Sequence, residues 1–184
     1  VDGMDVREYK ITDLRDKIGI VPQKAVLFAG TVRSNLAWGK EDATEEEMQQ
    51  ALSVAQAAEV VDKKDGKLDA EVEQGGKNFS GGQKQRLTIA RALVKQPEIL
   101  IMDDSSSALD YATDAKLRQA IHNMPNRPTV FIVSQRAASI MYADKIIVLD
   151  DGTVAGTGTH EELLKDCRVY QEIYYSQTDK KEGA

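Results

Sequence analysis

The sequence lacks the features that mark membrane-spanning, disulfide-stabilised or generally nucleic-acid-binding proteins. Its one cysteine, Cys167, excludes an intrachain disulfide, which suits a reducing compartment, and is expected to be a packed or surface thiol. No apolar run approaches the roughly 20 residues of a membrane span. Acidic residues outnumber basic ones by 30 to 24, and the net charge of −6 argues against nucleic acid as a partner.

What is present suits a globular protein with a substantial core, since 41% of the 184 residues are hydrophobic. Three short apolar runs, at 18–21, 99–102 and 129–133, are typical of buried strands, and helical patterns separate them. This alternation predicts an α/β fold with a mostly parallel sheet. A fourth run, 145–149, leads into Asp151-Gly152 and predicts an antiparallel hairpin.

The segment between the first two strands has a different residue pattern. The capping-box pattern at 44–47 predicts a helix that continues to about Val61, and no strand is evident in this region. We therefore predict a helical subdomain at 38–96, inserted in an α/β core made of 1–37 and 97–184. A second capping box, at 159–162, predicts the start of a C-terminal helix.

The most informative segment is Asn78 to Leu87. Ser80 is expected to cap the helix that follows, and the consecutive glycines Gly81 and Gly82 would let a ligand approach the backbone closely. The free amides and the dipole at such a helix start favour a phosphate group.

Polar side chains follow the predicted strands. Asp103 and Asp104 end the second strand, an arrangement by which P-loop proteins hold Mg²⁺ and position a water molecule. Gln23 and Gln135 come after the first and third strands. Because ligands gather at the carboxyl ends of parallel strands, we expect these residues to lie at a binding edge.

In order and spacing, these segments resemble the nucleotide-binding domain of ATP-binding cassette (ABC) transporters over nearly the whole chain. Residues 80–83 match the signature loop, Asp103 the end of the Walker B strand, 107–110 the D-loop, and Gln23 the Q-loop. Residues 26–36 are similar to the exporter branch, whose cassettes are fused behind a transmembrane region. The resemblance implies a P-loop NTPase-like ABC ATPase core.

The resemblance also implies shared sites, in which two cassettes sandwich two ATP molecules. The implied ATP-binding residues are Gln23, Ser80, Gly81, Gly82, Gln83, Asp103 and Asp110. Gln23 and Asp103 would attend Mg²⁺ in the chain's own site, whereas the signature loop would contact the γ-phosphate of ATP held by a partner cassette.

A transmembrane domain is the second partner that the resemblance implies, and it would place the chain at the cytoplasmic face of the plasma (inner) membrane. Coupling helices of that domain would face the segment after Gln23, with Phe28. Alternatively, Phe28 fills the core, and for Trp38 a core position is the expected one. His122 and His160 do not cluster at ligand spacing, so we expect no metal there.

Three positions depart from the family's pattern. Asp104 stands where the family has its catalytic Glu, Gln135 where it has a switch His, and Gln74 where exporters usually carry a Glu that meets a coupling helix. Asp is one methylene shorter than Glu, and Gln cannot carry a proton's charge as His can. We therefore predict a degenerate own site in one half of a heterodimeric multidrug-type exporter, while the intact signature loop completes the partner's site.

The 184 residues contain no Gly-x-x-x-x-Gly-Lys-Ser/Thr loop. Because residues 1–3 match the stretch just after the P-loop helix, we expect a chain truncated after the Walker A motif that neither binds Mg-ATP tightly nor hydrolyses it alone. Two alternatives stay open: a hydrolytically active homodimeric exporter domain with Asp104 as the base, and a non-transport cassette acting as an ATP-gated clamp. The charge and the exporter-like run argue against the clamp.

Overall fold

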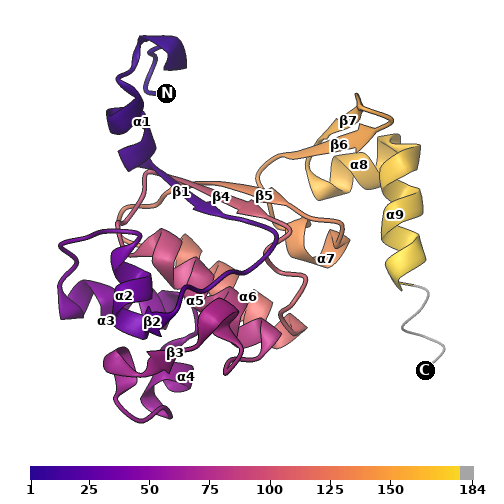
Figure 1. Ribbon diagram of the computed structural model, residues 1–184. Helices are drawn as coiled ribbons and strands as arrows, with labels where there is room; N and C mark the ends of the chain where they lie inside the picture. The colour runs from indigo at the N-terminus through magenta and orange to yellow at the C-terminus, as the bar shows by residue number, and fades with distance from the viewer. Residues whose placement is uncertain (179–184) are drawn as a thin grey trace. The chain divides into compact units, whose positions relative to one another are not determined.

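The structure is a computed structural model that describes residues 1–178 (Figure 1). The chain divides into two compact units, residues 1–133 and the residues from Ser134 on. Each unit has its own hydrophobic cluster. Among the described residues, no helix combines the length and the apolar character needed to cross a bilayer.

A three-stranded parallel sheet forms the centre of the first unit. Its strands, in spatial order, are β1 (Ile18–Val21), β4 (Ile99–Asp103) and β5 (Thr129–Val133). The three predicted strands are confirmed, with β4 one residue longer because Asp103 pairs with Val133. Val21, Leu100 and Met102 are buried on the inner face of the sheet.

Helices cover that inner face. The helices of this unit are η1 (Val6–Glu8), α1 (Ile11–Lys17), α2 (Val32–Ala37), α3 (Glu45–Val54), α4 (Ala58–Asp62), η2 (Lys67–Asp69), η3 (Gln74–Gly76), α5 (Gly81–Leu93) and α6 (Tyr111–His122). Figure 1 shows α5 and α6 against the same side of the sheet. Ile89 and Leu93 of α5 and Leu117 of α6 join the strand residues in one core cluster.

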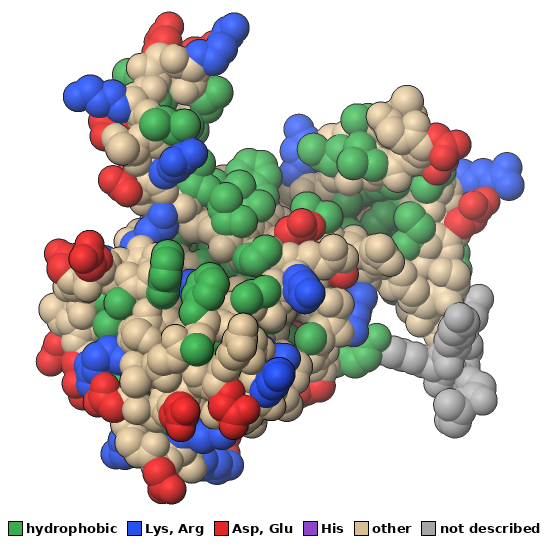
Figure 2. Space-filling model, in the orientation of Figure 1, with side chains coloured by type: hydrophobic (Ala, Val, Ile, Leu, Met, Phe, Trp, Pro, Cys, Tyr) green, Lys and Arg blue, Asp and Glu red, His purple; other side chains and the backbone are tan. Residues whose placement is uncertain are grey.

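The outer face of the sheet is apolar and exposed. Ile20 pairs with Ile101, and Ile101 with Phe131, so these three side chains lie in one row across the sheet. Ile20 is 60% exposed, and Phe131 and Val133 are each 57% exposed. Apolar side chains gather over these strands in Figure 2. Parallel sheets normally have both faces covered, so this face has the character of a surface that another element covers.

The region between β1 and β4 differs from its prediction in two ways. The predicted helix starts at the expected capping box but breaks after Val54, because Gln56 adopts a left-handed conformation with φ of 56°, and α4 follows as a separate helix. A short strand that the sequence did not indicate, β3 (Glu71–Val72), pairs with β2 (Gly30–Thr31) in antiparallel fashion. Such short strands leave no periodic pattern in a sequence.

The second unit contains the predicted hairpin, made of β6 (Ile146–Asp150) and β7 (Thr153–Gly158). Its helices are α7 (Ala137–Ile140), α8 (His160–Asp166) and α9 (Arg168–Thr178). The capping box of α8 is confirmed, but the expected single C-terminal helix is two helices, because Cys167 has extended backbone angles. The Cys167 side chain is buried, and His160 Nδ1 lies 2.8 Å from the Tyr170 hydroxyl.

Candidate functional site

The signature segment begins α5 as predicted. Ser80 Oγ accepts a hydrogen bond from the Gln83 amide at 3.3 Å, and Gln83 Oε1 accepts one from the Ser80 amide at 2.9 Å, which makes a reciprocal capping box. This pairing confirms the expected cap. It also shows that Gln83, predicted to bind ATP, holds the backbone at the helix start.

The two glycines of this segment have different surroundings. The first helical hydrogen bond runs from the Lys84 amide to the Ser80 carbonyl at 2.9 Å, so the amides of Gly81 and Gly82 precede the ladder of the helix. A methyl group added to Gly81 would meet nothing within 4 Å, whereas one on Gly82 would lie 3.1 Å from the Ala108 carbonyl oxygen. Gly81 therefore faces open space, and Gly82 permits close packing on the D-loop.

Asp103 and Asp104 lie where predicted, at the carboxyl end of β4. Gln23 follows β1, which runs parallel to β4 with Val21 opposite Met102, so all three residues come from the same edge of the sheet. Gln23 and Asp103 are exposed and Asp104 is half-buried. The edge thus presents oxygen ligands to solvent.

The backbone of Asp104 is held on both sides. Its amide donates to the Val133 carbonyl at 2.9 Å, and its carbonyl accepts from Ser107 Oγ at 2.9 Å. Its φ of 42° lies in the left-handed region, which Asp tolerates better than most residues. These bonds restrict any backbone shift that would carry the carboxylate forward.

Asp110 caps α6, a role that was not predicted from the sequence. Its carboxylate accepts from the Thr113 amide at 2.9 Å and from Thr113 Oγ1 at 2.7 Å. These hydrogen bonds lower the pKa of Asp110. The Asp-x-x-Thr spacing is a signal that could have revealed this cap.

Gln135 belongs to the second unit. Its side chain is exposed, and its carbonyl accepts a 2.7 Å hydrogen bond from Gln177 Nε2 on α9. The same Gln177 side chain accepts from the Ala137 amide at 3.0 Å, so it holds the start of α7. Gln74, at the start of η3, is also exposed.

Two exposed aromatic side chains form a patch in the first unit, called here the aromatic patch: Phe28 and Trp38. Their ring centroids are 5.0 Å apart. Trp38 is 70% exposed, so its expected core position is wrong, and Phe28 is 44% exposed. The Arg91 guanidinium lies 5.1 Å from the Phe28 ring centroid.

Arg91 and Asn35 hold the segment that carries this patch. Arg91 donates to the Val26 carbonyl at 3.0 Å, to the Asn35 carbonyl at 2.9 Å and to Asn35 Oδ1 at 2.7 Å. The buried Asn35 side chain in turn exchanges two hydrogen bonds with the Phe28 backbone. Burial lowers the pKa of Arg91. This network joins residues far apart in the chain and was not predicted.

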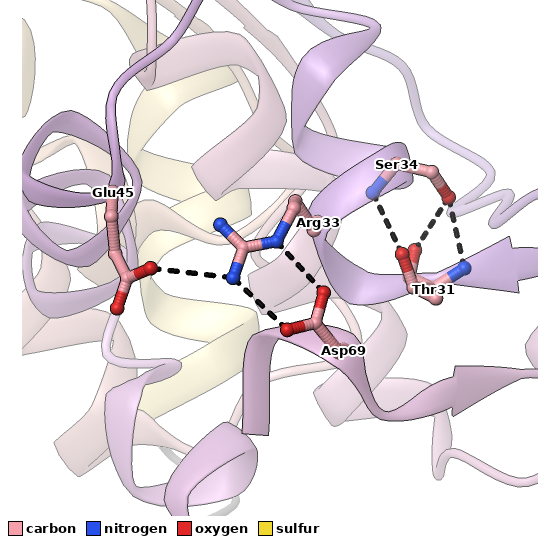
Figure 3. A network of polar contacts seen from close by, with 5 residues as sticks. All are labelled: Thr31, Arg33, Ser34, Glu45 and Asp69. Atoms are coloured by element: carbon pink, nitrogen blue, oxygen red, sulfur yellow. Dashed lines mark hydrogen bonds and ion pairs between the residues drawn. The ribbon is translucent and has the colours of Figure 1, made fainter. Parts of the chain in front are cut away.

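A second polar network anchors α2 to the elements around it (Figure 3). Arg33 donates to both carboxylate oxygens of Asp69, at 2.8 and 3.0 Å, and to Glu45 at 3.3 Å. The hydrogen bond to Asp69 is the main reason that the pKa of Arg33 is raised, and it lowers the pKa of Asp69. Thr31 and Ser34 close a capping box beside it.

The residues present fit the phosphate of ATP and a magnesium ion carried by it. The open space at Gly81, next to exposed backbone at a helix start, suits a phosphate oxygen. Within residues 1–178, no group of three or more His, Cys, Asp or Glu residues could hold a metal by itself. Mg²⁺, however, needs only one or two protein ligands together with nucleotide phosphates and water, and Gln23 and Asp103 offer oxygen atoms of that kind.

The parallel sheet with helices packed on it defines an α/β domain, which carries carboxylates at the sheet edge and a capped glycine segment at a helix start. Residues 1–107 match the family model described as "ABC transporter", and the chain therefore belongs to the ABC transporter family, with the ABC ATPase fold. This membership and the ABC ATPase fold confirm the family resemblance found in the sequence.

Similar proteins include an uncharacterized ABC transporter ATP-binding protein of Mycobacterium tuberculosis, 49% identical over 181 residues, which are 97% of this chain and 31% of that protein. A beta-(1→2)glucan export ATP-binding/permease protein of Rhodopseudomonas palustris is 43% identical over 177 residues, which are 96% of this chain and 29% of that protein. The solved structure of a bacterial Atm1-family ABC exporter with ATP bound is 37% identical, with a TM-score of 0.90, and the match covers 96% of this chain and 31% of that one. The chain thus spans about a third of these relatives' length.

Proposed function

We propose that this chain supplies the signature half of an ATP site in an exporter, while its own Walker B site hydrolyses ATP slowly. The observation that carries the proposal is the start of α5, where the exposed Ser80–Gly81 backbone is fixed by a capping box and open to a ligand. The terminal phosphate of ATP bound by a partner cassette is the ligand that fits, because amides and a helix dipole favour an anion.

The proposed weakness of the own site rests on Asp104 and Gln135. Because hydrogen bonds hold the backbone of Asp104 on both sides, the carboxylate cannot easily advance to recover the reach of the missing methylene. A carboxylate that lies about 1 Å too far from the attacking water can lower the rate of hydrolysis by roughly 100-fold. Gln135 presents an amide, which donates a hydrogen bond but does not take up a proton as His does.

The remaining parts of this chain's own ATP site would come from other segments of the transporter. We assign the phosphate-binding loop and its strand to a part of the protein outside these 184 residues. The exposed apolar face with Ile20 and Phe131 supports this assignment, since another element of a nucleotide-binding domain would cover it. Mg²⁺, when bound with ATP, would neutralise phosphate charge beside Gln23 and Asp103.

We further propose that the aromatic patch is where a transmembrane domain docks. Phe28 and Trp38 expose a large apolar area that hydrogen bonds from Arg91 and Asn35 hold in place. Exposed, ordered aromatic side chains are typical of interaction sites. The longer relatives with ATP-binding/permease in their names support this partner and a position at the cytoplasmic face of the membrane.

The test is ATP hydrolysis by the intact transporter with Gly81→Glu and Gly81→Ala. Gly81 faces open space, so both side chains fit the fold, but the carboxylate would repel a phosphate. We expect Glu to lower hydrolysis at least 100-fold, and Ala to lower it far less. Gly81→Ala is the matched control, because it leaves the Ser80–Gln83 capping box in place and adds no charge. Equal rates for the Gly81 variants would refute the proposed role.

A second experiment tests the degenerate site and the heterodimer. Asp104→Glu restores the missing methylene, and we expect it to raise hydrolysis at this chain's own site by 10-fold or more. In contrast, if Asp104→Ala abolishes hydrolysis in a transporter purified with no second type of cassette subunit, the protein is an active homodimer in which Asp104 acts as the base.

A further inference from the structure

The loop that leads into the signature segment is held by Asn78. Its Nδ2 donates to the Glu71 carbonyl at 2.8 Å, and its Oδ1 accepts from the Glu73 amide at 3.1 Å. Both hydrogen bonds reach β3 or the residue directly after it. A single side chain, two residues before Ser80, thus ties the start of α5 to a strand.

Lys64 holds the same loop from the side of α4. Its ammonium group donates to the Asn78 carbonyl at 3.1 Å and lies 4.5 Å from the centroid of the Phe79 ring. The Phe79 side chain is buried, and the Lys64 side chain is half-buried. Such a cation–π contact gains strength when water is partly excluded. The two bonded residues, Asn78 and Phe79, immediately precede Ser80.

The clamp formed by Lys64 and Asn78 is also connected to the aromatic patch. β3 pairs with β2 through Val72 and Gly30, and the Val32 amide donates to the Ala70 carbonyl at 3.1 Å. β2 begins two residues after Phe28, so the chain leads from the patch directly into a strand that is hydrogen-bonded to β3. The side chain of Asn78 then links β3 to the signature segment through its two hydrogen bonds.

We propose that Lys64 and Asn78 are positioning residues for the nucleotide: they hold the Ser80–Gly82 backbone in the position from which its amides can bind the phosphate. This inference rests on the proposed function of that segment. Contacts from β3, from the residue after it and from Lys64, in the loop after α4, meet at Asn78 just before the helix start. A shift of about 1 Å there would misalign every amide of the first turn. Lys64 also adds a positive charge to the loop that leads into the proposed phosphate site.

Lys64→Met tests the inference in the intact transporter. It keeps the aliphatic stem but removes the donor and the cation, and we expect the KM for ATP to rise about tenfold with kcat nearly unchanged, because the clamp serves ground state and transition state alike. Lys64→Arg should restore most of the affinity. Lys63→Met is the matched control, because it removes the same charge from a side chain that is 73% exposed and pairs with Glu59.

Two further variants separate the contacts. Phe79→Leu keeps an apolar side chain and removes only the ring, so combining it with Lys64→Met should raise KM by less than the product of the single effects. Asn78→Ala should raise KM by 10-fold or more. A role confined to folding predicts a different pattern, a lower yield and kcat with KM unchanged.

The outcomes distinguish the two proposals. If Gly81→Glu leaves hydrolysis intact, the proposed function fails. If Gly81→Glu abolishes hydrolysis while Lys64→Met, Lys63→Met and Asn78→Ala all keep the wild-type KM, only the positioning role is refuted.

Discussion

Replacing Arg91 with Met is expected to loosen the segment that carries the aromatic patch. Met keeps the length and apolar stem of Arg, so the change removes the guanidinium with little loss of packing. Three hydrogen bonds disappear, of 2.7, 2.9 and 3.0 Å, to Asn35 and Val26. The contact with the Phe28 ring disappears with them.

The size of the effect follows from those contacts. Hydrogen bonds from charged donors each contribute about 1.5–3 kcal/mol, and the bond to Val26 counts for less because it is exposed. Asn35 keeps its own bonds to the Phe28 backbone, so the segment remains attached. Removing Arg91 also removes the cost of burying its charge, which offsets part of these contributions. We therefore expect a loss of about 2–4 kcal/mol in local stability, which corresponds to roughly 30- to 700-fold faster amide exchange.

Hydrogen exchange followed by mass spectrometry on peptides that cover residues 24–38 measures this directly in the full-length protein. Arg86→Met is the matched control: Arg86 lies on the same helix but donates to the Gln56 carbonyl at 2.8 Å, away from the patch. It should leave exchange in 24–38 unchanged. Wild-type protection of residues 24–38 in Arg91→Met would show that Arg91 does not hold this segment.

Three shorter predictions concern stability. The pKa of Asp69 is lowered chiefly by its hydrogen bond with Arg33. The ionised carboxylate therefore stabilises the fold above the ordinary carboxyl pKa, and this contribution is lost as pH falls through the lowered pKa. Asp69→Asn should flatten the acid limb of a series of thermal unfolding measurements at different pH. Gly39→Ala places a methyl 2.0 Å from a backbone oxygen of α5 and should cost about 1–3 kcal/mol in denaturant unfolding, whereas Gly81→Ala should cost far less. Tyr170→Phe removes the 2.8 Å bond to the histidine of α8 and should cost about 1 kcal/mol in the same assay; an unchanged midpoint would contradict it.

Features set by local chemistry were predictable from the sequence. Ser80 with Gln83 caps α5, and Thr159 with Glu162 caps α8, because each side chain bonds an amide three residues away. The strands were visible as short apolar runs. Asp103 and Asp104 could be placed because a strand end is also a position in the sequence.

Features set by distant contacts were not predictable. The exposure of Trp38 depends on what packs around it, which no local pattern records. The bonds from Arg91 to Asn35 join residues 56 positions apart, and the hold of Lys64 on Asn78 depends on where α4 ends. The break at Gln56 was not predicted either, since the residues on either side favour a helix.

The opening turn of α5 is proposed to bind a nucleotide that is seated in another subunit, and a structure of the intact exporter with trapped ATP would test this contact. We expect Ser80 Oγ and the Gly82 amide to lie within hydrogen-bond distance of the terminal phosphate of nucleotide bound to the partner cassette. A triphosphate held far from both atoms would contradict it.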